Sequence, residues 1–136
     1  LGYAEYHTSA YWTAPELDDV TPITTDGLLP LGTDFPIEKI DPLLTFYTAV
    51  ARKNAEGKPE QGFLPEGGLS RLETLKGMTI WPAIASFEEN EKGSLEVGKF
   101  ADFILLDKDI MTVKESEILT TNVLYTVVGG EVVWGD

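Results

Sequence analysis

Leu28-Leu29-Pro30-Leu31-Gly32-Thr33-Asp34-Phe35-Pro36 is the most informative stretch of this sequence. An apolar run this short, bounded by Gly and Pro, favours an inner strand of a parallel sheet over a helix, because a helix needs greater length. The run ends in a carboxylate, so Asp34 falls at the carboxyl end of the predicted strand. Barrel enzymes place their chemistry on that rim. Asp34 is therefore a candidate catalytic residue, and the alternative is that it only caps the following element.

Two helices are predicted after this strand. Asp41-Pro42 is a typical helix start, with Asp as N-cap and Pro in the first turn, and apolar residues then recur at helical spacing through about Lys53. Ser70 and Glu73 have the spacing of a capping box, which starts a second helix that is bent at Trp81-Pro82 and ends near residue 89. We expect its apolar face to be lined by Leu72, Leu75, Met78 and Thr79.

The pattern changes to strands beyond residue 92. A strand is predicted within residues 100–107, and residues 123–128 and 131–134 form a hairpin joined by Gly129-Gly130, a turn suited to positive φ. Asp102 is expected to fix a turn at a strand edge and to take no part in catalysis. Three strands without a helix to cover them make a poor independent unit, so we expect further strands from elsewhere.

Composition excludes several classes of partner. The 136 residues are 43% hydrophobic, which is typical of a globular chain, and 23 acidic against 10 basic side chains give a net charge of −13. Such a surface repels phosphate backbones and anionic lipid heads, so we expect no nucleic-acid partner. No apolar run approaches the about 18 residues that span a bilayer, so no membrane insertion is expected. The absence of Cys excludes disulfides and thiolate chemistry and leaves the compartment open.

Four segments, in this order and spacing, resemble the C-terminal part of the metal-dependent amidohydrolase superfamily, in the group that includes N-substituted formamide deformylase. They are Leu31-Gly32-Thr33-Asp34-Phe35-Pro36, Asp41-Pro42-Leu43-Leu44, residues 91–107, which contain "GSLEVGKFADFILLD", and Val128-Gly129-Gly130-Glu131-Val132-Val133. The third segment is quite specific by itself, and its distance from a Gly-Thr-Asp strand makes the resemblance stronger.

The resemblance implies an α/β fold, in which this chain is the C-terminal fragment of a TIM-like (β/α)8 barrel plus the C-terminal strands of a small β-sandwich. Residues 28–33 would be the eighth barrel strand. Residues 1–92 would hold the last strand or strands and closing helices of the barrel, and residues 93–136 the C-terminal part of the composite sandwich. A first residue of Leu1, where a complete gene product has Met, agrees with a fragment.

The resemblance also implies a reaction. Asp34 matches the family's Asp on the last barrel strand, which contacts the catalytic metal and acts as general base on the attacking water. His7 precedes Thr8-Ser9 in a segment that faintly resembles the preceding barrel strand, so it is a candidate substrate-pocket residue. The expected cofactor is a divalent metal, with zinc as the first choice, in the full-length protein, and the expected substrate is a small molecule with a non-peptide, amide-type C–N bond.

A single His speaks against a complete metal site in this chain, because a catalytic zinc takes about three protein ligands, generally rich in His. We therefore expect the isolated chain to be inactive, with its partner being the remainder of the hydrolase chain. Two alternatives stay open. One is a non-catalytic remnant or oligomeric binding module derived from the same scaffold, and the other is an acidic ligand- or protein-binding domain, since fold does not fix function.

Overall fold

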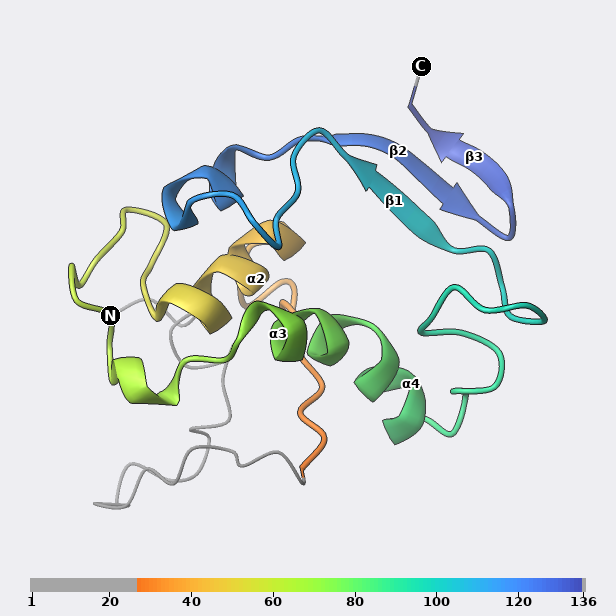
Figure 1. The fold of residues 1–136 in the computed structure, drawn as a ribbon, viewed down its shortest axis with the longest axis horizontal. Helices are drawn as coiled ribbons and strands as arrows, with labels where there is room; N and C mark the ends of the chain where they lie inside the picture. Colours follow the sequence, from red (N-terminus) through yellow and green to blue (C-terminus); the bar gives the residue numbers. More distant parts are fainter. Residues whose placement is uncertain (1–26, 136) are drawn as a thin grey trace.

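The computed structural model describes residues 27–135. Along this part of the chain the α-helices come first and the strands last. In Figure 1 the strands lie above α3 and α4, and the segment that follows α4 connects them to β1. His7 lies outside the described residues. The elements are α2 (Pro42–Ala51), η2 (Pro65–Gly67), α3 (Arg71–Met78), α4 (Ile80–Ala85), β1 (Phe103–Leu106), η3 (Glu115–Thr120), β2 (Val123–Val128) and β3 (Glu131–Trp134).

Helix α2 forms where the sequence predicts it. The Asp41 carboxylate accepts a hydrogen bond from the Leu43 amide at 2.9 Å, and Pro42 occupies the first turn, where its missing N–H costs nothing. The helix ends at Arg52, which adopts the left-handed conformation and donates its amide to the Thr48 carbonyl. Both ends are therefore set by local capping, and the N-terminal cap is the one that the sequence predicted.

The hydrophobic core lies between α2 and the 3-10 helix η3. Phe46, Tyr47 and Ala51 of α2 form one buried cluster with Ile118 of η3, whose side chain is fully buried. At the edge of this cluster, Lys53 forms an ion pair with Glu115 at 2.7 Å. The core thus joins residues from both sides of position 92, and the domain boundary near that position stays a prediction.

The second predicted helix is divided into α3 and α4. The capping box is confirmed, since the Glu73 amide donates to the Ser70 hydroxyl and the Ser70 amide donates to the Glu73 carboxylate. The break comes at Thr79, so Pro82 falls in the first turn of α4, the part of a helix that tolerates proline. Helix α4 ends at Ala85, short of the predicted end near residue 89.

The predicted apolar face of α3 is wrong. Leu72 is 55% exposed and Leu75 is 37% exposed, whereas the buried residues of the helix are Thr74 and Gly77. At Gly77 the physical reason is tertiary: a Cβ atom there would lie 2.8 Å from the Leu29 carbonyl oxygen, so a larger residue does not fit.

The three C-terminal strands form the predicted antiparallel sheet, in the order β1-β2-β3. Gly129 and Gly130 have φ of 57° and 83°, the conformation that a two-residue hairpin turn requires. Asp107 and Asn122 close the opposite end of the β1–β2 pair. The Asp107 amide donates to the Asn122 carbonyl, and the Asp107 carboxylate accepts from the backbone and side-chain amides of Asn122, both at 2.8 Å.

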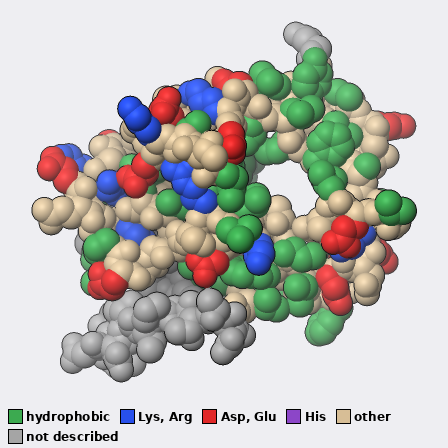
Figure 2. All heavy atoms as spheres, in the orientation of Figure 1, with side chains coloured by type: hydrophobic (Ala, Val, Ile, Leu, Met, Phe, Trp, Pro, Cys, Tyr) green, Lys and Arg blue, Asp and Glu red, His purple; other side chains and the backbone are tan. Residues whose placement is uncertain are grey.

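The sheet leaves large apolar side chains exposed. Val132, Val133 and Trp134 of β3 are 58–60% exposed, and Ile104 and Leu105 of β1 are almost half exposed. Figure 2 shows hydrophobic side chains over the sheet and around an opening between it and the helices. The prediction that this strand set has little cover is confirmed for the described part of the chain.

The predicted strand at residues 28–33 is absent. This segment is extended, but the sheet of residues 27–135 contains only β1, β2 and β3, so no parallel neighbour lies beside it. A strand is defined by hydrogen bonds to an adjacent strand, and here the Leu31 amide donates instead to the Gly77 carbonyl of α3 at 2.8 Å. The barrel strand expected from the resemblance is therefore not seen within the described residues.

Replacing Ile118 with Ala tests the core. Ile118→Ala should lower the free energy of unfolding of the chain by about 2–5 kcal/mol, because it leaves a cavity in a fully buried site. Val132→Ala is the matched control: its site is 60% exposed, and the change should cost less than about 0.5 kcal/mol. Urea unfolding measures both, and equal losses would contradict this location of the core.

The Asp107–Asn122 pair predicts a pH dependence. Hydrogen bonds from the Asn122 backbone and side chain hold the pKa of Asp107 below its usual value of 3.8. The resulting stability is fully present above that usual value and is lost as the pH falls through the lowered pKa, because the unfolded chain then binds more protons. Between about pH 5 and pH 2, the free energy of unfolding should fall less steeply for Asp107→Asn than for wild type.

Asn122→Ala should show an intermediate slope in the same titration. It removes the side-chain donor to Asp107 and keeps the backbone donor. Parallel curves for all three proteins would show that the pair does not contribute to acid sensitivity.

Candidate functional site

Asp34 lies in an exposed turn directly after the extended segment 28–33. Its φ is 50°, in the left-handed region that non-glycine residues rarely occupy, although Asp tolerates it better than most. The turn is held locally, since the Asp34 carbonyl accepts from the Ile37 amide at 2.8 Å and the Thr33 hydroxyl accepts from the Phe35 amide at 3.3 Å. Strained backbone of this kind is concentrated at functional sites, which supports a functional interpretation of the Asp34 carboxylate.

Helix α3 supports the segment that leads to Asp34. Besides the hydrogen bond from the Leu31 amide, the backbone of the segment lies directly against Gly77. A Cβ atom at position 77 would lie 2.8 Å from the Leu29 carbonyl oxygen and 2.9 Å from the Leu31 side chain. Sequence reasoning did not single out Gly77, although a glycine inside a helical pattern is a signal of close packing.

The described residues do not make up a metal site. Among residues 27–135, no group of three or more His, Cys, Asp and Glu side chains is placed to hold a metal ion. Asp34 can supply a single carboxylate, and a catalytic zinc takes about three protein ligands. His7, the predicted pocket residue, lies outside the described residues, so its position relative to Asp34 stays a prediction.

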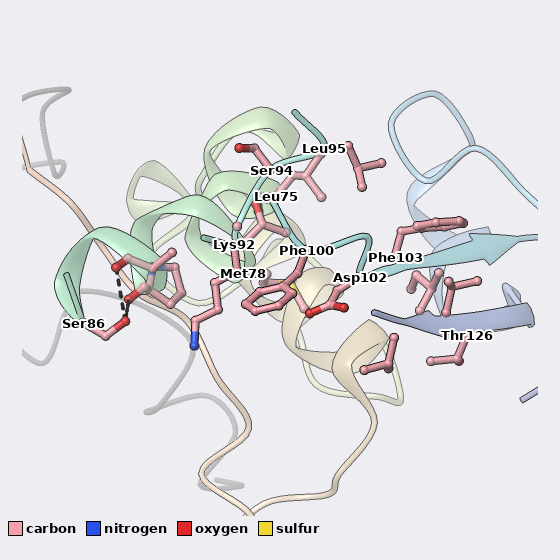
Figure 3. Close-up of a pocket in the computed structure, with 17 residues that line it drawn as sticks. Leu75, Met78, Ser86, Lys92, Ser94, Leu95, Phe100, Asp102, Phe103 and Thr126 are labelled. Carbon is pink, nitrogen blue, oxygen red and sulfur yellow. Dashed lines mark hydrogen bonds between the residues drawn. The ribbon is translucent and has the colours of Figure 1, made fainter. Parts of the chain in front are cut away.

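A large apolar cavity lies between the helices and the sheet. Its volume is about 790 Å³, and Figure 3 shows side chains from both α3 and the sheet around it. Two of the polar groups at its wall have partners: Lys92 pairs with Glu88 at 2.6 Å, and the Ser94 hydroxyl accepts from Lys99. Apolar lining residues include Leu75, Met78, Phe100, Phe103 and Val127. Asp34 is not among the residues that line this cavity.

Asp102 also lines this cavity, and its predicted structural role is confirmed. Its carboxylate accepts a hydrogen bond from the Gly129 amide at 2.7 Å, while the neighbouring Ala101 carbonyl accepts from Gly130 at 3.0 Å. Together these bonds hold the β2–β3 turn against the residues that precede β1. Asp102 fixes a turn, as the sequence indicated.

Comparison with known proteins decides the family. The amidohydrolase family model matches residues 9–134. The chain belongs to the amidohydrolase family. This amidohydrolase chain is 36% identical over 106 residues to the protein LONG AFTER FAR-RED 3 of Arabidopsis thaliana, with 78% of the chain and 18% of that protein covered. It is also 36% identical over 100 residues to the N-substituted formamide deformylase of Arthrobacter pascens, with 74% of the chain and 18% of the deformylase covered.

The fold agrees with the family. The crystal structure of an amidohydrolase from Thermotoga maritima superposes with a TM-score of 0.51 at 23% identity, over 80% of the chain and 23% of that structure. The chain thus spans about a fifth of the length of the relatives that it matches. No helix in residues 27–135 has the length and apolar character needed to cross a membrane.

Removing the Asp102 carboxylate tests its structural role. Asp102→Ala should lower the free energy of unfolding by about 1 kcal/mol, because the Gly129 amide loses its charged acceptor, and exchange of the Gly129 amide hydrogen should accelerate. Glu131→Ala, a carboxylate removed from the same hairpin, is the control and should leave Gly129 protection unchanged. Equal protection in both variants would contradict the role of Asp102.

Proposed function

We propose that this chain is the C-terminal part of a metal-dependent amidohydrolase that hydrolyses a non-peptide, amide-type C–N bond of a small molecule. Membership of the amidohydrolase family supports hydrolysis of this bond type. The observation that carries the role of this particular chain is Asp34: an exposed carboxylate in strained backbone, at the end of a segment fixed on α3.

Asp34 acts as the proton carrier in this proposal. Its carboxylate takes one proton from the attacking water as the water oxygen bonds to the carbonyl carbon. When the C–N bond breaks, the same group returns that proton to the departing nitrogen. The proton that Asp34 takes from water ends on the departing nitrogen, so no further reactant is needed. These two proton transfers require one carboxylate from this chain.

The metal belongs to the complete enzyme in this proposal, with zinc as the expected ion and Asp34 as one contact. Because the described residues do not form a metal site, the other ligands must come from polypeptide outside residues 27–135. The isolated chain is then inactive, and its partner is the remainder of the hydrolase.

The exposed apolar side chains of the sheet also fit the second candidate, a non-catalytic oligomeric module of the same scaffold. In that case the sheet is covered by another copy of the chain and no hydrolysis occurs. Activity and metal content of the complete gene product separate the two candidates.

Replacing Asp34 in that complete product tests the proposed role. Asp34→Asn keeps the size of the side chain but cannot accept the proton, so kcat for small N-acyl and N-formyl compounds should fall by about 100- to 10,000-fold. Elemental analysis should find metal in the wild-type protein. Glu38→Gln, a carboxylate replaced four residues later along the same connection, is the control and should keep wild-type kcat.

Two results would overturn the proposal. Wild-type kcat in Asp34→Asn would remove the assigned base. A metal-free complete product that hydrolyses no compound in the panel would remove the hydrolase itself and leave the oligomeric module, which size-exclusion chromatography would then detect.

A further inference from the structure

Gly77 is an unexpected residue at its place in α3. It lies near the C-terminal end of a helix that runs from Arg71 to Met78, where alanine would stabilise the helix better. Its φ is not in the left-handed region, so the backbone conformation does not require glycine. The reason for glycine here must therefore be the space around it.

That space is filled by the segment that leads to Asp34. A Cβ atom at position 77 would meet the Leu29 carbonyl oxygen at 2.8 Å and the Leu31 side chain at 2.9 Å, closer than real Cβ contacts come. The Leu31 amide donates to the Gly77 carbonyl at 2.8 Å in the same contact. Helix and segment thus touch backbone to backbone, which fixes both their distance and their register.

Asp34 follows Leu31 by only three residues. The connection is short, and the turn that begins at its end is held by hydrogen bonds from the Phe35 amide to the Thr33 hydroxyl and from the Ile37 amide to the Asp34 carbonyl. Because only two residues separate Leu31 from Asp34, a displacement of Leu31 should also move the Asp34 carboxylate. Since a shift of about 1 Å in a reacting group can cost about 100-fold in rate, this contact is placed to control catalysis.

We propose that Gly77 is the positioning residue for Asp34. By lacking a side chain, it lets the segment 28–33 lie directly on α3 and so sets where the Asp34 carboxylate stands. This inference rests on the proposed function for its catalytic consequence, whereas the contact itself can be tested without any activity.

The first test measures the contact in the chain itself. Gly77→Ala should speed hydrogen exchange of the Leu31 amide by at least about 10-fold, because the added methyl group pushes the segment away from its acceptor. The matched control is Gly32→Ala, in the same segment, where an added Cβ meets nothing within 4 Å and Leu31 protection should stay at the wild-type level. Unchanged protection in Gly77→Ala would overturn the inference.

The second test measures catalysis in the complete enzyme. Gly77→Ala should lower kcat by about 10- to 100-fold with KM changed less than about threefold, because substrate binding is kept and the base is displaced. A merely structural role would lower the melting temperature but leave kcat of the folded enzyme unchanged, whereas a positioning role lowers kcat of the folded enzyme itself. Gly32→Ala should keep wild-type kcat.

A double variant covers the case in which Gly77→Ala folds poorly. Leu31→Ala together with Gly77→Ala removes the side-chain part of the clash, so part of the lost kcat and of the melting temperature should return. Absence of any rescue would contradict this contact. If Asp34→Asn keeps full activity while Leu31 exchange responds as expected, the proposed function fails and the structural contact stands.

Discussion

The packing of Ile118 against α2 forms the buried centre of the described structure. It is the point at which the helical first half and the strand-bearing second half share one core. Arg71 strengthens the same junction from α3, where its guanidinium donates to the carbonyls of Ile110 and Val113. Charge-assisted bonds of this type are stronger than neutral ones and fix the direction of the connecting chain. These contacts hold the connection between β1 and β2 against the helices.

Polar side chains then define the ends of the sheet. Asp107 closes one end with Asn122, and Asp102 holds the turn at the other with Gly129. Both carboxylates lie at the surface, where water competes for the same hydrogen bonds, so they set the register of the strands more than they supply stability. The apolar side chains on the strands themselves remain largely exposed. This sheet is thus well defined in geometry and incomplete in packing, which agrees with a chain that spans about a fifth of its relatives.

Asp34, the candidate base, is held by a different kind of contact. Asp34 is displayed by a short turn whose support is a backbone contact with α3, not an apolar side-chain core. A contact made by the backbone of both partners, with only the Leu31 side chain added, leaves little freedom to relax. The chain therefore contains a hydrophobic core between α2 and η3, and separately a close contact between α3 and the segment that leads to Asp34.

The sequence by itself determined the features that depend on neighbouring residues. The Asp41 cap, the Ser70–Glu73 capping box and the Gly129-Gly130 turn were predictable, because each is a short-range hydrogen bond or a backbone preference. The turn-fixing role of Asp102 was predicted as well, but the turn that it fixes lies 27 positions further along the chain and is identified only by the structure. The family resemblance was also readable, since residues 91–107 carry a specific pattern. These features need no knowledge of the partner surfaces.

Tertiary structure decided what depends on distant contacts. Residues 28–33 have the composition of a strand, yet without a neighbouring strand in the described region they lie on α3 and pair with Gly77. The same contact buries Gly77 of α3, while Leu72 and Leu75 of that helix stay exposed. Hydrophobic periodicity indicates which side chains of a helix can be buried. Which of them are buried depends on how closely other segments approach that helix, and this distance is set only when the whole chain has packed.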